Sequence, residues 1–253
     1  MLTKRGVLLH IQTVSLLALN ILLMKINEYY IKARLFPTIL TSIPILSLYY
    51  FGFSEKIMEF FIFIDGYKWA SDITLSISII YFLVQINRLI SKELFQNIFF
   101  KEELNMPTTN FLLNSDKTLA KSMKSQIVQK IAADFNIHLL DSNSENENEE
   151  EARKTISSAV AQVRNVTRGN SMLLQHNIEY GFVRNLIGGS VLAAIISIIN
   201  VYLFEYAFPN QFAFKLNLVL LCFYILPIIL SKFLINKYGK YYAKILFEQY
   251  LKK

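Results

Sequence analysis

Long apolar runs alternate with polar segments along this 253-residue chain, and one stretch combines both kinds. Residues 164–204 are polar in their first half and apolar in their second. From Leu186 to Ala207 the only strongly polar residues are Asn200 and Glu205, and a helix needs about 20 apolar residues to cross a bilayer core. The pattern predicts a polar helical surface that continues directly into a transmembrane helix, so that a displacement of the first half is passed to the second.

Three further apolar runs, 35–53, 73–90 and 216–235, also have the length of a transmembrane helix. Together with residues 186–207 they predict an all-α membrane protein with four transmembrane helices and a cytoplasmic helical domain inserted between the second and the third. The predicted order is an N-terminal cytoplasmic or interfacial helix (1–34), a first transmembrane hairpin (35–90), the cytoplasmic domain (91–185) with an acidic loop (141–151), a second transmembrane hairpin (186–235) and a basic cytoplasmic tail (236–253). For residues 7–24, a fifth transmembrane helix is the alternative to an interfacial one.

The distribution of charge indicates how such a protein is oriented. Residues 1–34 carry five basic and one acidic residue, and residues 186–253 carry seven basic and two acidic ones. Residues 54–72 carry four acidic and two basic residues, which suits an external loop. Because basic residues favour the cytoplasmic side, both termini are predicted to be cytoplasmic.

Two local patterns inside the predicted spans indicate how the helices pack. Pro37 and Pro44 are seven residues apart, so both lie near one helix face, where they are expected to kink the first span. Gly189, Ala193 and Ser197 form a stripe of small residues at four-residue spacing, which is typical of a close helix-packing face.

Polar residues recur along the second predicted span at intervals of three and four, which places them on one helix face. The residues on this face are Ser71, Thr74, Ser78, Tyr81, Gln85 and Arg88. Two interpretations remain open. The face is either a polar seam that hydrogen-bonds to neighbouring helices or the wall of a water-lined pore, with Arg88 at its cytoplasmic mouth.

The cytoplasmic domain is expected to begin with an amphipathic helix that leaves the membrane, SKELFQNIFFKEEL (residues 91–104), followed by a turn at Pro107. Two further helical patterns are expected within it. The first runs from about residue 118 to 140 and carries Lys117, Lys121 and Lys124 on a shared face. The second begins near Glu149, where carboxylates favour a helix N-terminus, and continues without a break into the third span.

Enzymatic and metal-binding motifs are not evident in the sequence. The histidines His10, His138 and His176 lack ligand spacing, and the single cysteine, Cys222, lies in an apolar run. The chain has no phosphate-cradling glycine loop and no nucleophile elbow. We therefore expect no metal, no cofactor and no enzymatic activity.

Basic, amide and tyrosine side chains on the polar half of the 164–204 stretch are the remaining candidates for ligand binding. They are Arg164, Arg168, Asn177, Tyr180 and Arg184. Arginine forks, amides and an aromatic ring suit a phosphodiester with a stacked base, and the three lysines of the preceding helix are further candidates. The alternative is a solvated charged face, or inter-subunit salt bridges to Glu102, Glu103 or the acidic segment.

Three segments, KARLFP, MPTTNFLLNSD and VRNVTRGNSMLLQHNIEYGFVRNLIGG, occur in an order that resembles small multi-pass membrane effectors of bacterial anti-phage defence islands. The resemblance is to the membrane channel effectors of the Hailong system. It covers most of the chain and is sharpest at residues 107–109 with Asp116, and over residues 177–185. The resemblance implies a homotetrameric ion channel in the bacterial inner membrane. It also implies that a partner nucleotidyltransferase makes short single-stranded DNA oligomers that keep the channel closed, so that their loss depolarises the infected cell.

The sequence thus leads to the expectation of a ligand-gated pore-forming effector, controlled by a nucleotide or a short DNA oligomer at its cytoplasmic domain. A non-conducting membrane anchor or scaffold for a soluble partner is the alternative.

Overall fold

The structure is a computed structural model that describes residues 28–53 and 68–253. Within these two ranges the chain is helical, without strands. The helical segments are α2 (Glu28–Tyr30), η1 (Ile31–Leu35), α3 (Phe36–Thr41), α4 (Ile43–Leu48), η2 (Tyr49–Phe53), α6 (Lys68–Ile90), η4 (Ser91–Gln96), α7 (Asn97–Phe100), η5 (Lys101–Glu103), α8 (Pro107–Asn110), α9 (Lys121–Phe135), α10 (Ser142–Glu147), α11 (Glu149–Val166), α12 (Ser171–Tyr206), α13 (Gln211–Ile229) and α14 (Ser231–Leu251).

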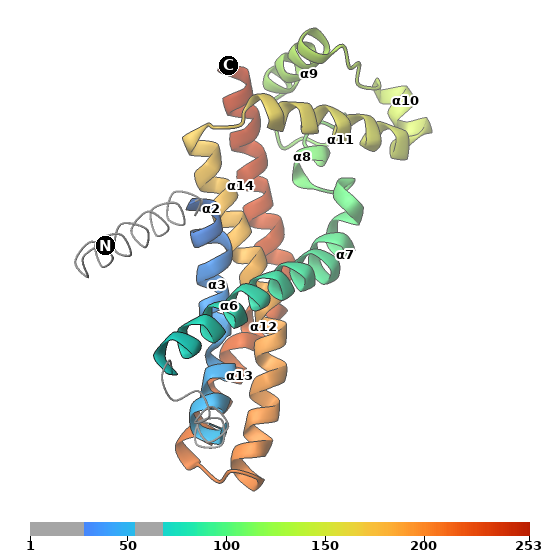
Figure 1. The fold of residues 1–253 in the computed structure, drawn as a ribbon. Helices are drawn as coiled ribbons and strands as arrows, with labels where there is room; N and C mark the ends of the chain where they lie inside the picture. Colours follow the sequence, from blue (N-terminus) through green and yellow to red (C-terminus); the bar gives the residue numbers. More distant parts are fainter. Residues whose placement is uncertain (1–27, 54–67) are drawn as a thin grey trace, which may run out of the picture.

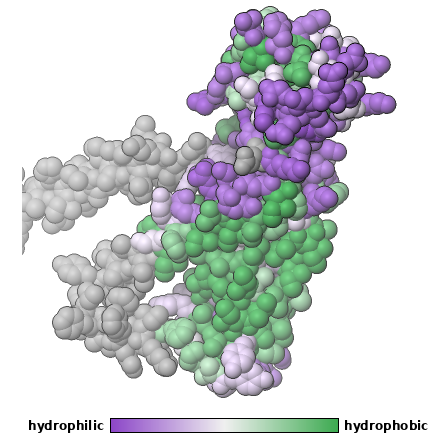
Figure 2. Space-filling view, turned by 90° about the vertical axis from the view of Figure 1, so that its right-hand side faces the viewer, coloured by the Kyte–Doolittle hydropathy of each residue, from purple (hydrophilic) through white to green (hydrophobic). Residues whose placement is uncertain are grey.

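Three helices among the described residues are long and apolar enough to cross a membrane: Glu28–Phe53, α12 and α13. They form the lower part of the molecule in Figure 1, and α6 crosses them obliquely. Figure 2 shows an apolar belt over this part and a hydrophilic head above it. The all-helical class is confirmed, and three of the four predicted spans coincide with helices that are long and apolar enough to cross a membrane. The span at 73–90 and the inserted cytoplasmic domain stay predictions. The N-terminal helix at 7–24 and most of the external loop at 54–72 lie outside the described residues.

The first apolar helix is interrupted where its prolines predict a kink. α3 ends before Ser42 and α4 begins after it, and Pro37 and Pro44 are both buried on the side that faces α12 and α13. The expectation that both prolines share one face is therefore confirmed.

Side chains from other helices satisfy two carbonyls that these prolines leave without a helical donor. Ala33 and Leu40 each lie four residues before a proline, which has no N–H to donate to them. Asn185 Nδ2 on α12 donates to the Ala33 carbonyl at 2.6 Å, and the Tyr224 hydroxyl on α13 donates to the Leu40 carbonyl at 2.6 Å. The kinked helix is thus fixed to both of its neighbours.

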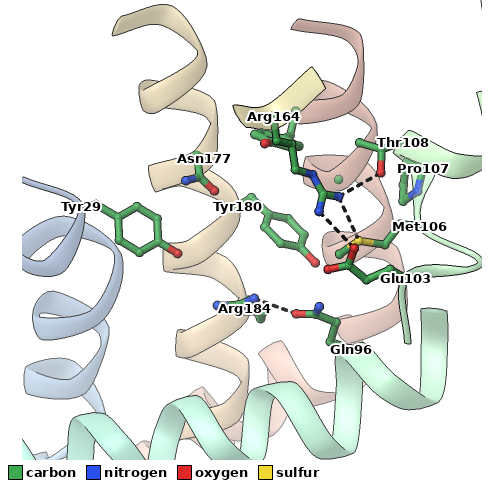
Figure 3. Close-up of a pocket in the computed structure, with 12 residues that line it drawn as sticks. Tyr29, Gln96, Glu103, Met106, Pro107, Thr108, Arg164, Asn177, Tyr180 and Arg184 are labelled. Carbon is green, nitrogen blue, oxygen red and sulfur yellow. Dashed lines mark hydrogen bonds and ion pairs between the residues drawn. The ribbon is translucent and has the colours of Figure 1, made fainter. Parts of the chain in front are cut away.

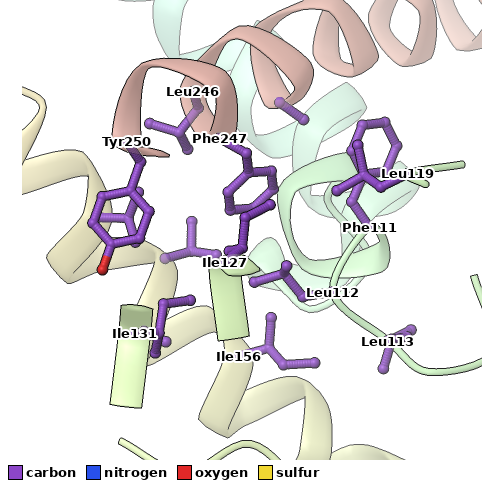
Figure 4. Packing of buried hydrophobic residues seen from close by; sticks show 14 of the residues in the cluster. Phe111, Leu112, Leu113, Leu119, Ile127, Ile131, Ile156, Leu246, Phe247 and Tyr250 are labelled. Atoms are coloured by element: carbon purple, nitrogen blue, oxygen red, sulfur yellow. The ribbon is translucent and has the colours of Figure 1, made fainter. Parts of the chain in front are cut away.

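The hydrophilic head is built around an apolar cluster that includes the C-terminal helix. Figure 4 shows α8, α9, α11 and α14 meeting in this cluster, where Ile127, Ile156, Leu246 and Phe247 are almost fully buried. The predicted basic tail (236–253) is therefore wrong, because α14 is a core helix of the head. Its lysines mark only the outer face of an amphipathic helix.

The fourth predicted span, 216–235, ends earlier in the structure than the sequence predicts. α13 begins at Gln211 and ends at Ile229, so residues 231–235 belong to α14 rather than to a span that ends at 235. A turn at Leu230 separates the two helices, three residues after Pro227.

The acidic segment 141–151 is helical rather than a loop. Asp141 caps α10 by accepting hydrogen bonds from the backbone N–H groups of residues 143 and 144. The Glu145 carboxylate is buried, and it accepts from the backbone and side-chain amides of Asn114 and from the backbone N–H of Ser115. A buried, hydrogen-bonded carboxylate fixes this segment to the head, which a run of solvated acidic residues does not predict.

Candidate functional site

A cavity of about 280 Å³ lies where the hydrophilic head meets the apolar belt, and Figure 3 shows its lining. Five parts of the chain converge on it: α2, the segment from η4 to α8, α11, α12 and α14. The lining residues are Tyr29, Gln96, Glu103, Met106, Pro107, Thr108, Arg164, Asn177, Tyr180, Arg184, Gly239 and Tyr242.

Arg164 enters the cavity from the last turn of α11. Its guanidinium pairs with the Glu103 carboxylate at 3.1 Å and donates to the Thr108 hydroxyl at 3.2 Å. The Arg164 side chain is 28% exposed and the Glu103 side chain is 41% exposed, so water and solutes reach this ion pair. The salt bridge to Glu103 lies within one chain, whereas the expected alternative was a salt bridge between subunits, and the pair remains open to an incoming anion.

Arg184 and Tyr180 lie one turn apart on the polar half of α12. Arg184 Nη1 donates to Gln96 Oε1 at 2.7 Å, and its guanidinium carbon lies 5.7 Å from the centroid of the Tyr180 ring. This is the distance of a cation–π contact. Figure 3 shows the Tyr180 ring between Arg164 and Arg184.

Several polar groups of the lining are buried without a partner. The Tyr180 residue is 8% exposed, and its hydroxyl has no hydrogen-bond partner among the described residues. The same is true of the Nε atoms of Arg164 and Arg184. Buried polar groups are normally hydrogen-bonded, so donors of this kind around a cavity suit a ligand that is rich in acceptors.

The α14 wall of the cavity was not predicted. A Cβ atom on Gly239 would lie 3.1 Å from the Pro107 ring, so the absence of a side chain lets α8 pack closely against α14. Beside it, burial raises the pKa of Tyr242, although the nearby Arg164 charge opposes this shift. The apolar periodicity of α14 was the available signal, but the lysines on its outer face obscured it.

The cavity brings together half of the predicted ligand-binding residues. Arg164, Asn177, Tyr180 and Arg184 line it. Arg168 does not, because α11 ends at Val166 and Gly169 has a φ of +90° in the turn before α12. The expectation of one unbroken helix from Glu149 into the third span is therefore wrong, although its start at Glu149 is confirmed.

The three lysines lie in the head, away from this cavity. Lys124 Nζ donates to the backbone carbonyls of Leu113 and Asp116, and burial lowers its pKa. Lys117 precedes α9, which begins at Lys121, so the predicted shared helix face is wrong.

The predicted pore-lining face is described in part. Ser71 and Thr74 lie on α6, but the structure describes the side chains of this helix only from residue 77 onward. Ser78, Tyr81 and Arg88 are exposed and Gln85 is half-buried. The buried side of α6 is formed by Leu83, Val84 and Asn87, and Asn87 donates to the hydroxyls of Thr38 and Thr41.

Below the cavity, α12 packs against its neighbours through small residues. Gly189, Ala193 and Ser197 are buried, so the predicted small-residue packing face is confirmed. A Cβ atom on Gly188 would lie 2.5 Å from the Asn87 carbonyl oxygen of α6. Asn185, next to Arg184, accepts from the Ser91 hydroxyl at 3.2 Å, so α6 and its continuation are fixed to α12 just below the cavity.

Among the described residues no group of histidine, cysteine and carboxylate side chains has a metal-ligating arrangement. Comparison with known protein families, curated proteins and solved structures finds no match for this chain. The site is therefore interpreted from its geometry and chemistry.

Proposed function

We propose that this protein is a membrane channel gated by an anionic ligand that binds the cavity between its hydrophilic head and its apolar belt. By its resemblance to defence-island effectors, it acts as a pore-forming antiviral effector in the bacterial inner membrane, with both termini in the cytoplasm. The ligand is a nucleotide or a short single-stranded DNA oligomer, made by a nucleotidyltransferase encoded alongside.

One observation carries the proposal: two arginines and the unpaired hydroxyl of buried Tyr180 converge on a single cavity. Guanidinium groups bind phosphate oxygens, and an aromatic ring supplies a surface for a base. The lining carries two positive side chains and one negative side chain, Arg164 and Arg184 against Glu103, which favours an anion.

The position of the cavity supports a gating role. Tyr180 and Arg184 lie on the same continuous helix, α12, that runs through the apolar belt to Tyr206. A ligand that fixes the upper half of α12 therefore acts on its lower half through a rigid element. The exposed polar positions of α6 supply a face for a pore between copies of the chain, and the resemblance implies four copies.

The binding test uses purified full-length protein and a short fluorescein-labelled oligothymidylate. Arg164→Ala is expected to weaken binding and to lower the salt slope of the affinity by about 1, as for the loss of one phosphate contact. Arg168→Ala is the matched control, since Arg168 lies outside the cavity. Equal curves for wild type and Arg164→Ala would remove the cavity from ligand binding.

Recording from the same protein in planar bilayers separates the channel from the non-conducting anchor or scaffold. A channel gives discrete current steps whose frequency changes when the oligothymidylate is added, and Arg164→Ala suppresses this response. A membrane without currents, under conditions where the protein binds the probe, would favour the scaffold.

A further inference from the structure

Both arginines of the cavity are held by acceptors from a single segment. Gln96 binds Arg184 and Glu103 pairs with Arg164. Both acceptors belong to residues 91–103, which follow α6 directly as η4, α7 and η5. We call this segment the α6 extension. Gln96 joins it to α12 and Glu103 joins it to α11, and Ser91 at its start also donates to Asn185 of α12.

The backbone at the end of the α6 extension is strained. Glu103 has a φ of 93° and Lys101 a φ of 41°, and neither is a glycine. A residue with a Cβ atom adopts such a conformation only under strain, unless its surroundings impose it. The Glu103 carbonyl accepts from the Thr109 hydroxyl at 2.9 Å, and its carboxylate reaches Arg164.

Among the described residues that line the cavity, Glu103 alone carries a carboxylate. Its oxygen lies 3.1 Å from one arginine nitrogen, where a bound phosphate oxygen would be expected. Gln96 Oε1 lies 2.7 Å from Arg184 Nη1, where a second phosphate oxygen would be expected. An anion that engages both guanidinium groups therefore competes with both acceptors of the α6 extension.

We infer that Glu103 and Gln96 are built-in competitors of the ligand, and that ligand binding releases residues 96–103 of the α6 extension from α11 and α12. The inference rests on the proposed anionic ligand of this cavity and specifies how the cavity is regulated. Without ligand, the two arginines hold the α6 extension. With ligand, they bind the anion, the strain at Glu103 is relieved, and residues 96–103 are free to shift relative to α11 and α12, beyond the fixed contact of Ser91 with Asn185.

The sign of one substitution tests the competition. Glu103→Gln removes the competing charge, so it is expected to tighten binding of the labelled oligothymidylate about two- to fivefold, the range for a partly exposed ion pair. Glu179→Gln is the charge-matched control. It removes a carboxylate from the polar half of α12, but this carboxylate contacts His176 rather than an arginine. In an Arg164→Ala background, Glu103→Gln is expected to have no effect.

The outcomes separate this inference from the proposed function. Failure of the wild-type protein to bind the probe overturns the proposed function itself. Binding by the wild type that Glu103→Gln leaves unchanged or weakens, or that Glu179→Gln tightens equally, overturns the competition alone.

Release of residues 96–103 is measured by the distance between spin labels at Ile98 and Gln175, exposed positions on α7 and α12, in a Cys222→Ala background. The distance distribution is expected to shift or broaden when the oligothymidylate is added, and Glu103→Gln without probe is expected to show part of this change. An identical distribution with and without bound probe would overturn the release.

Discussion

At the scale of single residues, buried polar side chains compensate for what the prolines of the first apolar helix remove. Tyr224 is fully buried, yet its hydroxyl reaches the Leu40 carbonyl that Pro44 leaves without a helical donor. Asn200 and Asn217 act nearby, since Asn200 donates to the Pro44 carbonyl at 2.7 Å and to the Asn217 side chain at 2.9 Å. Such contacts account for polar residues in segments that are otherwise apolar.

Replacement of Tyr224 by phenylalanine tests this compensation. Loss of the hydroxyl leaves a buried carbonyl without its donor, and the expected destabilisation is about 1 kcal/mol, measured by thermal unfolding in detergent. Tyr202→Phe is the control, because Tyr202 is 63% exposed. In a Pro44→Ala background, residue 44 carries an N–H that can donate to the Leu40 carbonyl. In this background Tyr224→Phe is expected to lower the stability only slightly. An equal cost in both backgrounds would show that the hydroxyl does not act through this carbonyl.

At the scale of helices, the features that the sequence predicts are those set by residues close together along the chain. The acidic start at Glu149, the proline kink and the small-residue stripe of α12 were all predictable, because each depends on residues within one or two turns. The break between α11 and α12 was also encoded, since Gly169 suits a positive φ and Asn170 caps α12 through the Leu173 N–H.

Long-range contacts were not predictable in the same way. The role of α14 in the head depends on packing with helices more than 70 residues earlier, and its lysines resemble those of a basic tail. The cavity residues on α12 share one face and were found together. Gln96 lies on the α6 extension and Tyr242 on α14, and only the tertiary fold brings them to Arg164 and Arg184, whereas Glu103 was among the expected salt-bridge partners.

The contact between α6 and α12 depends on glycine at position 188. Gly188→Ala would place a Cβ atom 2.5 Å from the Asn87 carbonyl and 2.7 Å from the Ser91 backbone nitrogen, which cannot move without the α6 backbone. We expect a loss of about 1–3 kcal/mol in stability, seen as a lower melting temperature in detergent. Gly52→Ala is the matched control, since its Cβ would lie 3.4 Å from the Leu48 side chain, an ordinary contact. Equal melting temperatures for wild type and Gly188→Ala would exclude close packing at this position.

At the scale of the whole molecule, the hydrophilic head and the far end of the apolar belt lie at opposite ends of α12. Figure 2 shows the head above the belt, and Figure 1 shows the turn between α12 and α13 at the lower end. Several large apolar side chains on the belt, such as Ile198, Val219 and Phe223, are more than half exposed. Exposed apolar surface of this extent suits contact with lipid or with other copies of the chain. If α12 and α13 form a transmembrane hairpin, the head and this turn lie on opposite sides of the bilayer.

Cysteine labelling in intact spheroplasts tests this arrangement, in a Cys222→Ala background that removes the only native thiol. Gln211→Cys, at the exposed start of α13, is expected to react with an impermeant thiol reagent added outside, because the turn is predicted to be external. Asn143→Cys, on exposed α10 of the head, is expected to react only after the membrane is permeabilised, since the basic flanks assign the head to the cytoplasm. Labelling of both positions from outside would rule out a transmembrane hairpin formed by α12 and α13. The reverse pattern would keep the hairpin but place the ligand cavity outside the cell, where a cytoplasmic nucleotide cannot reach Arg164 and Arg184.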